Sequence, residues 1–290
     1  AWELATIIKL DFTRAKHIKK MINGLYPRMP CSTWINHMCE KNGIVIKTPQ
    51  TLEAARKKHC HINAIRAFFT KHEHLLKRDP HLLWNADETS SASSRKYKVL
   101  MNSFNISPIT TLRPIEPHIT GVFPYNAAGY QLDPFIILHD LMHLPEELKS
   151  FNCFFTSQKS GWCTLKIFEI FSIYFSNKIS VYRQSLPKTL RNETMVLLVD
   201  NHSSRFSSFA VEYLRQNNIR LVTFPPHCTH VLQPFDVCVA RGLKSRITTS
   251  KLTEDLKRYV TTLPTKAAQA RYSTIYAMVN AWKTTSTTVL

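Results

Sequence analysis

An unbroken apolar run, Met195 to Val199, constrains the fold most strongly, and it ends directly in Asp200. Because the run is apolar at every position, it predicts a strand that is buried on both faces, as in parallel α/β sheets. A helical pattern over 204–218 follows, then another apolar strand pattern over 219–226. Strand, helix and strand at this spacing predict two parallel strands joined by a right-handed crossover.

Further strand and helix patterns surround this unit. Residues 81–87 predict a short strand that ends in Asp87, and residues 118–140 predict a hairpin with Gly129 in its connection. Residues 233–247 predict a helix with Pro234 near its first turn, where proline is tolerated. Parallel and antiparallel strands together predict an α/β fold with a mixed sheet flanked by helices.

The ends of the chain have different patterns. Residues 16–25, 31–43 and 48–78 predict helices, and the apolar positions of the last recur at helical spacing: Ile62, Ile65, Phe68, Phe69, Leu75 and Leu76. Residues 251–290 are polar and weakly patterned, which predicts a helix followed by a frayed end. The pattern changes near residue 80, where we expect a domain boundary.

The net charge of the chain is +18 over 290 residues, and the first 80 residues carry half of this excess. Such an excess favours a polyanionic partner, either nucleic acid or an anionic membrane surface, and the alternative is a basic but inert surface. No apolar run approaches the length of a membrane span, and the first residues do not resemble a secretory signal. The seven scattered cysteines contain no C-x-x-C pair, so we expect reduced thiols in an intracellular protein.

Three aspartates follow predicted strands or begin a predicted helix. Asp200 ends the apolar run, Asp87 ends an earlier strand, and Asp236 lies in the first turn of a helix. Ligands of α/β sheets bind at the carboxyl ends of strands, whereas the alternative role for Asp200 is a helix cap. Ser203 and Ser204 are better placed for that cap. Three neighbouring carboxylates repel one another unless a cation is present, and their oxygens favour Mg²⁺ or Mn²⁺.

The same segments carry a family resemblance. The chain resembles the DDE-superfamily endonuclease domain of pogo-like transposases, within the mariner-type superfamily, over roughly residues 81–250. Asp200 and Asp236 have the separation typical of that group, with 35 residues between them. The matching segments, in order, are WNADET (84–89), ITGVFPYNAAG (119–129), DPFIIL (133–138), GWCTLKIFEIF (161–171), LLVDNHSS (197–204) and PPHCTHVLQPFD (225–236).

The resemblance implies an RNase-H-like fold with a catalytic, metal-binding triad of Asp87, Asp200 and Asp236. It implies two Mg²⁺ ions, or Mn²⁺, that activate water and later a DNA 3′-hydroxyl and that stabilise the leaving oxygen. His202 and His230 flank two of the motifs. Either they orient water or phosphate from behind the metal ligands, or they make structural hydrogen bonds.

The upstream segment resembles the end of a centromere-protein-B-type helix-turn-helix domain. The resemblance implies that a helix over residues 33–41 approaches DNA through Thr33, Asn36 and Lys41, and that Arg56, Lys57 and Lys58 contact phosphate. It also places a further helix-turn-helix unit before the first residue of the sequence. We therefore expect a partial DNA-binding domain at 1–58, a helical linker at 59–80, the endonuclease domain at 81–250 and a helical or flexible tail at 251–290.

The expected function is metal-dependent DNA cleavage and strand transfer at transposon ends, in the nucleus, with double-stranded DNA as partner and a possible homodimer but no membrane. The alternative is a transposon-derived DNA-binding protein without catalytic activity. It is motivated by departures from the family pattern at His227, Phe235 and Cys238, where Asn, Leu and Gly are usual.

Several other residues are weaker candidates. Asp133 and Asp140 are rival carboxylates near a strand end, and His139 and His143 have zinc-like spacing without an evident third ligand. Glu88 should face away from Asp87 on a strand, which favours a supporting or surface role. Trp34 and Trp84 are expected in the core.

Overall fold

The computed structural model describes residues 37, 41, 62–91, 118–257 and 266–285. The chain divides into two compact units, residues 1–57 and 58–290. In the first unit, the described residues His37 and Lys41 are helical. Every described strand belongs to the second unit.

Four strands around the apolar run form one set, in the order β4-β1-β7-β8. All five residues of β7 are buried, and β7 pairs in parallel with β1 and with β8, while β4 pairs antiparallel to β1. Helix α8 (Ser208–Gln216) connects β7 to β8, which confirms the predicted parallel crossover. The strands are β1 (Leu83–Asn85), β4 (Tyr125–Asn126), β7 (Met195–Val199) and β8 (Ile219–Thr223).

A second set of four strands has the order β2-β3-β5-β6. Strand β3 pairs antiparallel with β2 and β5, and β6 pairs in parallel with β5. The predicted hairpin is thus present as β3 and β5, but its connection also contains β4, which joins the first set. The strands are β2 (Glu88–Ser91), β3 (Ile119–Val122), β5 (Phe135–His139) and β6 (Phe154–Gln158).

The two sets of strands meet at Asp87. The chain leaves β1, passes through Ala86 and Asp87, and enters β2 on the other set. Backbone hydrogen bonds continue across this junction, from the Ala86 N–H to the Leu198 carbonyl (3.3 Å) and from the Phe123 N–H to the Asp87 carbonyl (3.1 Å). The predicted mixed sheet is therefore present, but it is interrupted at the first candidate aspartate.

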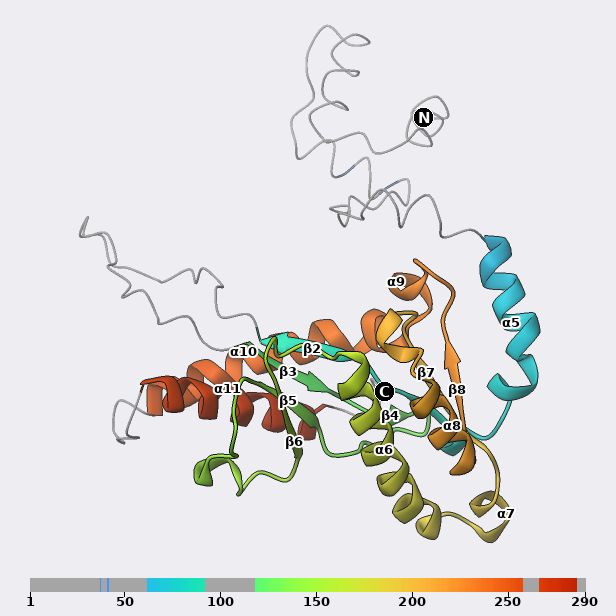
Figure 1. Ribbon diagram of the computed structural model, residues 1–290. Coiled ribbons are helices and arrows are strands. Elements are labelled where there is room, and N and C mark those ends of the chain that lie inside the picture. The colour runs from blue at the N-terminus through green and yellow to red at the C-terminus, as the bar shows by residue number, and fades with distance from the viewer. Residues whose placement is uncertain (1–36, 38–40, 42–61, 92–117, 258–265, 286–290) are drawn as a thin grey trace, which may run out of the picture. The chain divides into compact units, whose positions relative to one another are not determined.

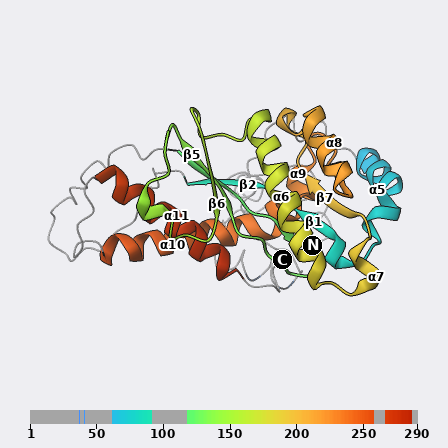
Figure 2. The ribbon, with the colours of Figure 1, turned by 60° about the horizontal axis from the view of Figure 1, so that its bottom comes forward.

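Helices cover both faces of this interrupted sheet (Figures 1 and 2). Alternate residues of β5 show the two faces, because Phe135 and Ile137 pack with α6 (Leu165–Ser185), whereas Ile136 and Leu138 pack with α10 (Ala240–Lys257) and α11 (Lys266–Lys283). The short helices are η1 (Pro80–Leu82), η2 (Glu146–Leu148), α7 (Lys188–Arg191), η3 (Ser203–Arg205), α9 (Thr229–Leu232) and η4 (Phe235–Val239).

The C-terminal part of the chain contributes to the core. Helix α10 continues past residue 251, and Ile275, Met278 and Trp282 of α11 are fully buried against the sheet. The Trp282 indole N–H donates a hydrogen bond to the Leu132 carbonyl at 2.8 Å. The segment expected to be a helix with a frayed end thus holds a helix with a buried face.

Helix α5 (Ile62–Leu76) lies within the long helical pattern predicted for residues 48–78, whose first part is outside the described residues. Phe68 and Leu75 are seven residues apart, so they share one helical face and pack on Val196, Leu198 and Val222. Not every apolar position of the pattern is buried, since Ile62 and Phe69 are 59% and 49% exposed.

The cap predicted for α8 is wrong. Ser203 begins the short helix η3, which His202 caps, and α8 begins later with Ser207 as its N-cap, whose hydroxyl accepts from the Ala210 N–H. Within the helical pattern over 204–218, Ala210 and Leu214 are buried, whereas Phe206 and Phe209 are exposed. The helix begins about one turn later than its pattern indicated and ends at Gln216, before the end of the pattern.

Among the described helices, none is both long enough and apolar enough to cross a membrane.

Candidate active site

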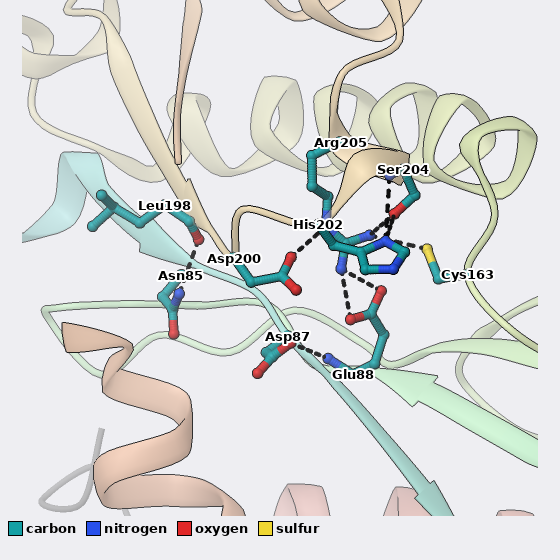
Figure 3. A network of polar contacts seen from close by, with 9 residues as sticks. All are labelled: Asn85, Asp87, Glu88, Cys163, Leu198, Asp200, His202, Ser204 and Arg205. Carbon is teal, nitrogen blue, oxygen red and sulfur yellow. Dashed lines mark hydrogen bonds and ion pairs between the residues drawn. The ribbon is translucent and has the colours of Figure 1, made fainter. Parts of the chain in front are cut away.

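The three candidate aspartates stand at the ends of neighbouring elements. Asp200 directly follows β7, Asp87 lies between β1 and β2, and Asp236 is in the first turn of the π-helical segment η4. Asn85 of β1 and Leu198 of β7 are register partners, so Asp87 and Asp200 each lie two residues beyond a paired position. Figure 3 shows the two carboxylates at the same edge of the sheet.

The side chain of Asn85 connects all three aspartate-bearing segments. It is buried, and its Nδ2 donates to the Leu198 carbonyl at 2.9 Å (Figure 3). Its Oδ1 accepts from the Phe235 backbone N–H at 3.1 Å and from the Tyr125 hydroxyl at 3.2 Å. One amide therefore fixes β1, the end of β7 and the start of η4 relative to one another.

Asp87 lies in an electrostatically unfavourable place for a carboxylate. Burial raises its pKa well above the usual range, and the charges of Glu88, Asp236 and Asp200 raise it further. Its Oδ1 accepts a hydrogen bond from the Glu88 N–H at 2.8 Å. The ionised form of Asp87 would be stabilised by a cation placed among these carboxylates.

The buried side chain of Arg205 forms ion pairs with two of the carboxylates, those of Glu88 and Asp200. The Arg205 side chain is 4% exposed, and its Nη2 donates to both oxygens of Glu88 at 2.5 and 2.6 Å (Figure 3). Its Nε donates to Oδ1 of Asp200 at 2.8 Å, and its guanidinium lies 5.0 Å from the centroid of the Phe168 ring. Arg205 thus ties β2 to the end of β7.

Glu88 is largely buried and lines the site together with Asp87, Asp200 and Arg205, so the prediction that it faces away from Asp87 is wrong. A supporting role for Glu88 stays a prediction. Burial alone would raise its pKa, but the adjacent Arg205 guanidinium outweighs burial, so the pKa of Glu88 is lowered. Burial would likewise lower the pKa of Arg205, but Glu88 and Asp200 raise it. The pair is therefore fully charged and internally compensated.

The residues present suit a divalent cation in charge and ligand type, although they are not arranged as a closed cage. Within the described residues, no group of three His, Cys, Asp or Glu side chains is placed to hold one ion, and Asp236 is exposed. The side chain of Gln233 lies near Asp87 and lowers the pKa of Asp87, which offsets part of the rise. The Nε2 and Oε1 atoms of Gln233 are buried and have no hydrogen-bond partner of good geometry among the described residues. Carboxylate and amide oxygens are ligands that Mg²⁺ and Mn²⁺ prefer.

The two histidines occupy different surroundings. His202 is exposed beside Asp200, and its Nδ1 accepts from the Ser204 N–H at 3.3 Å as the cap of η3. His230, on α9, is half-buried, and its buried Nδ1 has no hydrogen-bond partner among the described residues. A role for either in orienting water or phosphate stays a prediction.

Most of the predicted DNA-contacting residues, Thr33, Asn36, Arg56, Lys57 and Lys58, lie outside the described residues, as does Trp34. Lys41 is described, as an exposed helical residue. The predicted core position of Trp84 is confirmed, because its side chain is fully buried.

The rival candidates do not join the aspartates. Asp133 pairs with Lys178 at 2.7 Å and accepts from the Asn152 amide, so its charge is compensated. Asp140, His139 and His143 are exposed at the end of β5 and beyond it. They belong to no three-residue metal group within the described chain.

The departures from the family pattern fit the structure in different ways. His227 has a positive φ of 62°, a backbone conformation in which Asn is favoured. Phe235 is buried and stacks on Phe123, whereas Cys238 is exposed.

Sequence patterns did not point to Asn85, Gln233 or Arg205. Asn85 gave a usable signal, because an amide inside an otherwise apolar strand must find buried partners. Arg205 gave no such signal in the sequence, because its partner Glu88 lies 117 positions away along the chain.

We predict that Asn85→Ala lowers the free energy of unfolding by about 3 kcal/mol, because it leaves buried groups of Leu198, Phe235 and Tyr125 without their partner. Urea unfolding measures this loss. Asn217→Ala is the control, since Asn217 is exposed and bonds only within the end of α8. Equal losses for the two variants would contradict the role of Asn85.

We expect Arg205→Met to lower the free energy of unfolding by about 3–5 kcal/mol, because it leaves Glu88 charged and buried. Adding Glu88→Gln to that variant should restore part of the loss. Arg215→Met, which breaks the exposed pair with Glu212, should have little effect in the same urea experiment. A double variant that is as unstable as the sum of its single variants would refute the pairing.

Comparisons with known proteins bear on this arrangement. Residues 119–290 match the DDE superfamily endonuclease family, which is more than half of the chain. A curated protein named MFS-type transporter clz9, from Cochliobolus lunatus, is 29% identical over 133 residues, which are 43% of this chain but only 13% of that protein. The chain thus spans a small part of this relative's length.

Solved structures give the fold. The Mos1 transposase paired-end complex with left transposon end has a TM-score of 0.50 at 10% identity and covers 97% of this chain and 75% of that chain. The Mos1 mariner paired end complex with Mn has a TM-score of 0.50 at 11% identity, with 98% and 76% covered. The expected RNase-H-like mixed sheet flanked by helices is confirmed by this likeness. By its family match over residues 119–290, the chain belongs to the DDE superfamily of endonucleases.

Proposed function

We propose that this protein is a metal-dependent DNA endonuclease that also transfers strands, with Asp87, Asp200 and Asp236 as its catalytic residues. The supporting observation is the place of Asp87 between β1 and β2, where burial and the charges of Glu88, Asp236 and Asp200 raise its pKa well above the usual range. This position lies at the carboxyl ends of parallel strands in a chain of the DDE endonuclease family.

Asp87, Asp200 and Asp236 would hold Mg²⁺ or Mn²⁺, two ions in all. Bound there, such ions would activate the attacking water and stabilise the leaving oxygen of a phosphodiester. The chain's own contribution is positioning. Arg205 engages Oδ1 of Asp200, and Asn85 fixes the backbone that carries the three carboxylates.

The proposed substrate is double-stranded DNA at transposon ends. The net charge of +18 suits a polyanion. The two similar solved structures are named paired-end complexes, one of them with a left transposon end. We further propose a pogo-like transposase that acts in the nucleus as a homodimer. A centromere-protein-B-type domain at 1–58 would bind DNA through Thr33, Asn36, Lys41 and Arg56–Lys58, and a linker at 59–80 would join it to the endonuclease. The endonuclease would extend beyond residue 250, because α11 packs in its core and the family match continues to residue 290.

The second candidate is a DNA-binding protein without catalytic activity. The exposed position of Asp236 and the lack of a three-ligand group within the described residues favour it. In that case Arg205 would be the lasting counter-ion of Asp200, with no need for a metal.

A nicking assay separates the two candidates. We expect the protein to nick supercoiled DNA that carries cognate ends when Mg²⁺ or Mn²⁺ is added, and we expect Asp236→Asn to slow nicking roughly 100-fold or more, because it removes a metal ligand. Asp140→Asn, at an exposed aspartate outside the site, should nick like the parent. DNA binding without nicking by the parent would support the second candidate.

Asp87→Asn should raise the stability of the metal-free protein by about 1 kcal/mol, because it removes a buried charge that is repelled by its neighbours. Asparagine keeps the oxygen that accepts from the Glu88 N–H. Thermal unfolding in EDTA measures the change, with Asp140→Asn as the matched control. A lower melting temperature for Asp87→Asn would contradict the proposed charge excess.

A further inference from the structure

An exposed tryptophan borders the candidate active site. Trp162 is 58% exposed, and it lines a cleft of about 600 Å³ that also contains Asp200 and Glu88. This volume is within the range of about 300–1,000 Å³ that is usual for ligand pockets. Trp162 is thus a large apolar side chain turned to solvent beside a candidate catalytic carboxylate, and nothing in the proposed cleavage chemistry uses it.

The indole is held in place although it is exposed. Its ring packs against the His118 ring, with centroids 4.4 Å apart and planes tilted by 35°. Gly161 precedes it with a φ of 69°, and a Cβ there would lie 2.8 Å from the His118 carbonyl oxygen. The backbone of Trp162 is also held, because its N–H donates to the Ser160 hydroxyl and its carbonyl accepts from the Thr164 backbone N–H. The ring is therefore presented by a fixed loop between β6 and α6.

The chemistry of the cleft narrows the choice of occupant. Trp162, Cys163 and Leu165 supply apolar lining, and the other residues that line the cleft are polar or charged by type, with Thr120, Ser203 and His202 among them. An apolar protein segment would leave these groups without partners, whereas a nucleotide offers both an aromatic face and hydrogen-bonding edges. Lys159 and Lys166, close to Trp162 in the chain, are exposed and add positive charge.

We propose that Trp162 is a stacking platform for an unpaired nucleobase of the DNA strand that enters the candidate active site. The inference rests on the proposed function, because the cleft leads to Asp200. The base must be unpaired and unstacked, since the faces of a base within a duplex are covered by its neighbours. Stacking on one face of the indole would fix the strand beside the carboxylates without reading its sequence.

The test compares binding of the 290-residue chain to labelled single-stranded DNA and to the same backbone carrying abasic sites, by fluorescence anisotropy without divalent metal. We expect the parent to prefer the base-bearing strand about 10- to 100-fold. Trp162→Ala should lose this preference, and Trp162→Phe should keep most of it. Phe209→Ala, which removes another exposed aromatic side chain that does not line the cleft, should bind like the parent.

A second measurement uses a fluorescent base in the bound strand. A strand containing 2-aminopurine should lose emission on binding, because the base stacks on the indole, and Trp162→Ala should abolish this quenching. Equal affinities for base-bearing and abasic strands, or quenching that survives Trp162→Ala, would overturn the inference.

The outcome is separable from that of the proposed function. Nicking without any dependence on Trp162 or on the base would refute the stacking platform alone. Trp162-dependent base preference in a protein that never nicks would refute the endonuclease and leave the platform standing.

Discussion

The Asn85 amide is the contact on which the geometry of the candidate site depends most. Its two polar atoms bond to the carbonyl two residues before Asp200 and to the N–H one residue before Asp236, while Asp87 lies two residues further along its own strand. Buried amides must be satisfied, so the strand edge and the start of η4 are held in one arrangement. The three aspartates can then approach one another although their charges disfavour it.

Arg205 compensates part of the negative charge that the carboxylates bring together, and a bound cation would compensate the rest. Arg205 neutralises Glu88 and holds one oxygen of Asp200 from the side of η3, whereas Asp87 keeps a raised pKa. A buried and unfavourable charge at the edge of a sheet is typical of functional sites, where proteins lose stability in exchange for binding a ligand. The adjoining cleft, bordered by Trp162, opens onto that edge, because Glu88 and Asp200 also line it.

Local patterns predicted the central elements of this fold well. The apolar run of β7 and the strands and helices after it follow from periodicity, because burial on both faces and parallel pairing act on consecutive residues. The interruption of the sheet at Asp87 and the shorter α8 did not follow, since they depend on tertiary contacts. The same holds for the site: three carboxylates could be picked out, but the partners of Arg205 are set by folding over more than a hundred residues.

Anomalous diffraction from crystals soaked in Mn²⁺ tests the central claim most directly. The account predicts a Mn²⁺ peak bound by Asp87 and Asp200, with Asp236 turned toward it and Arg205 still bonded to Oδ1 of Asp200. A map at saturating Mn²⁺ with no peak among the three carboxylates would contradict it.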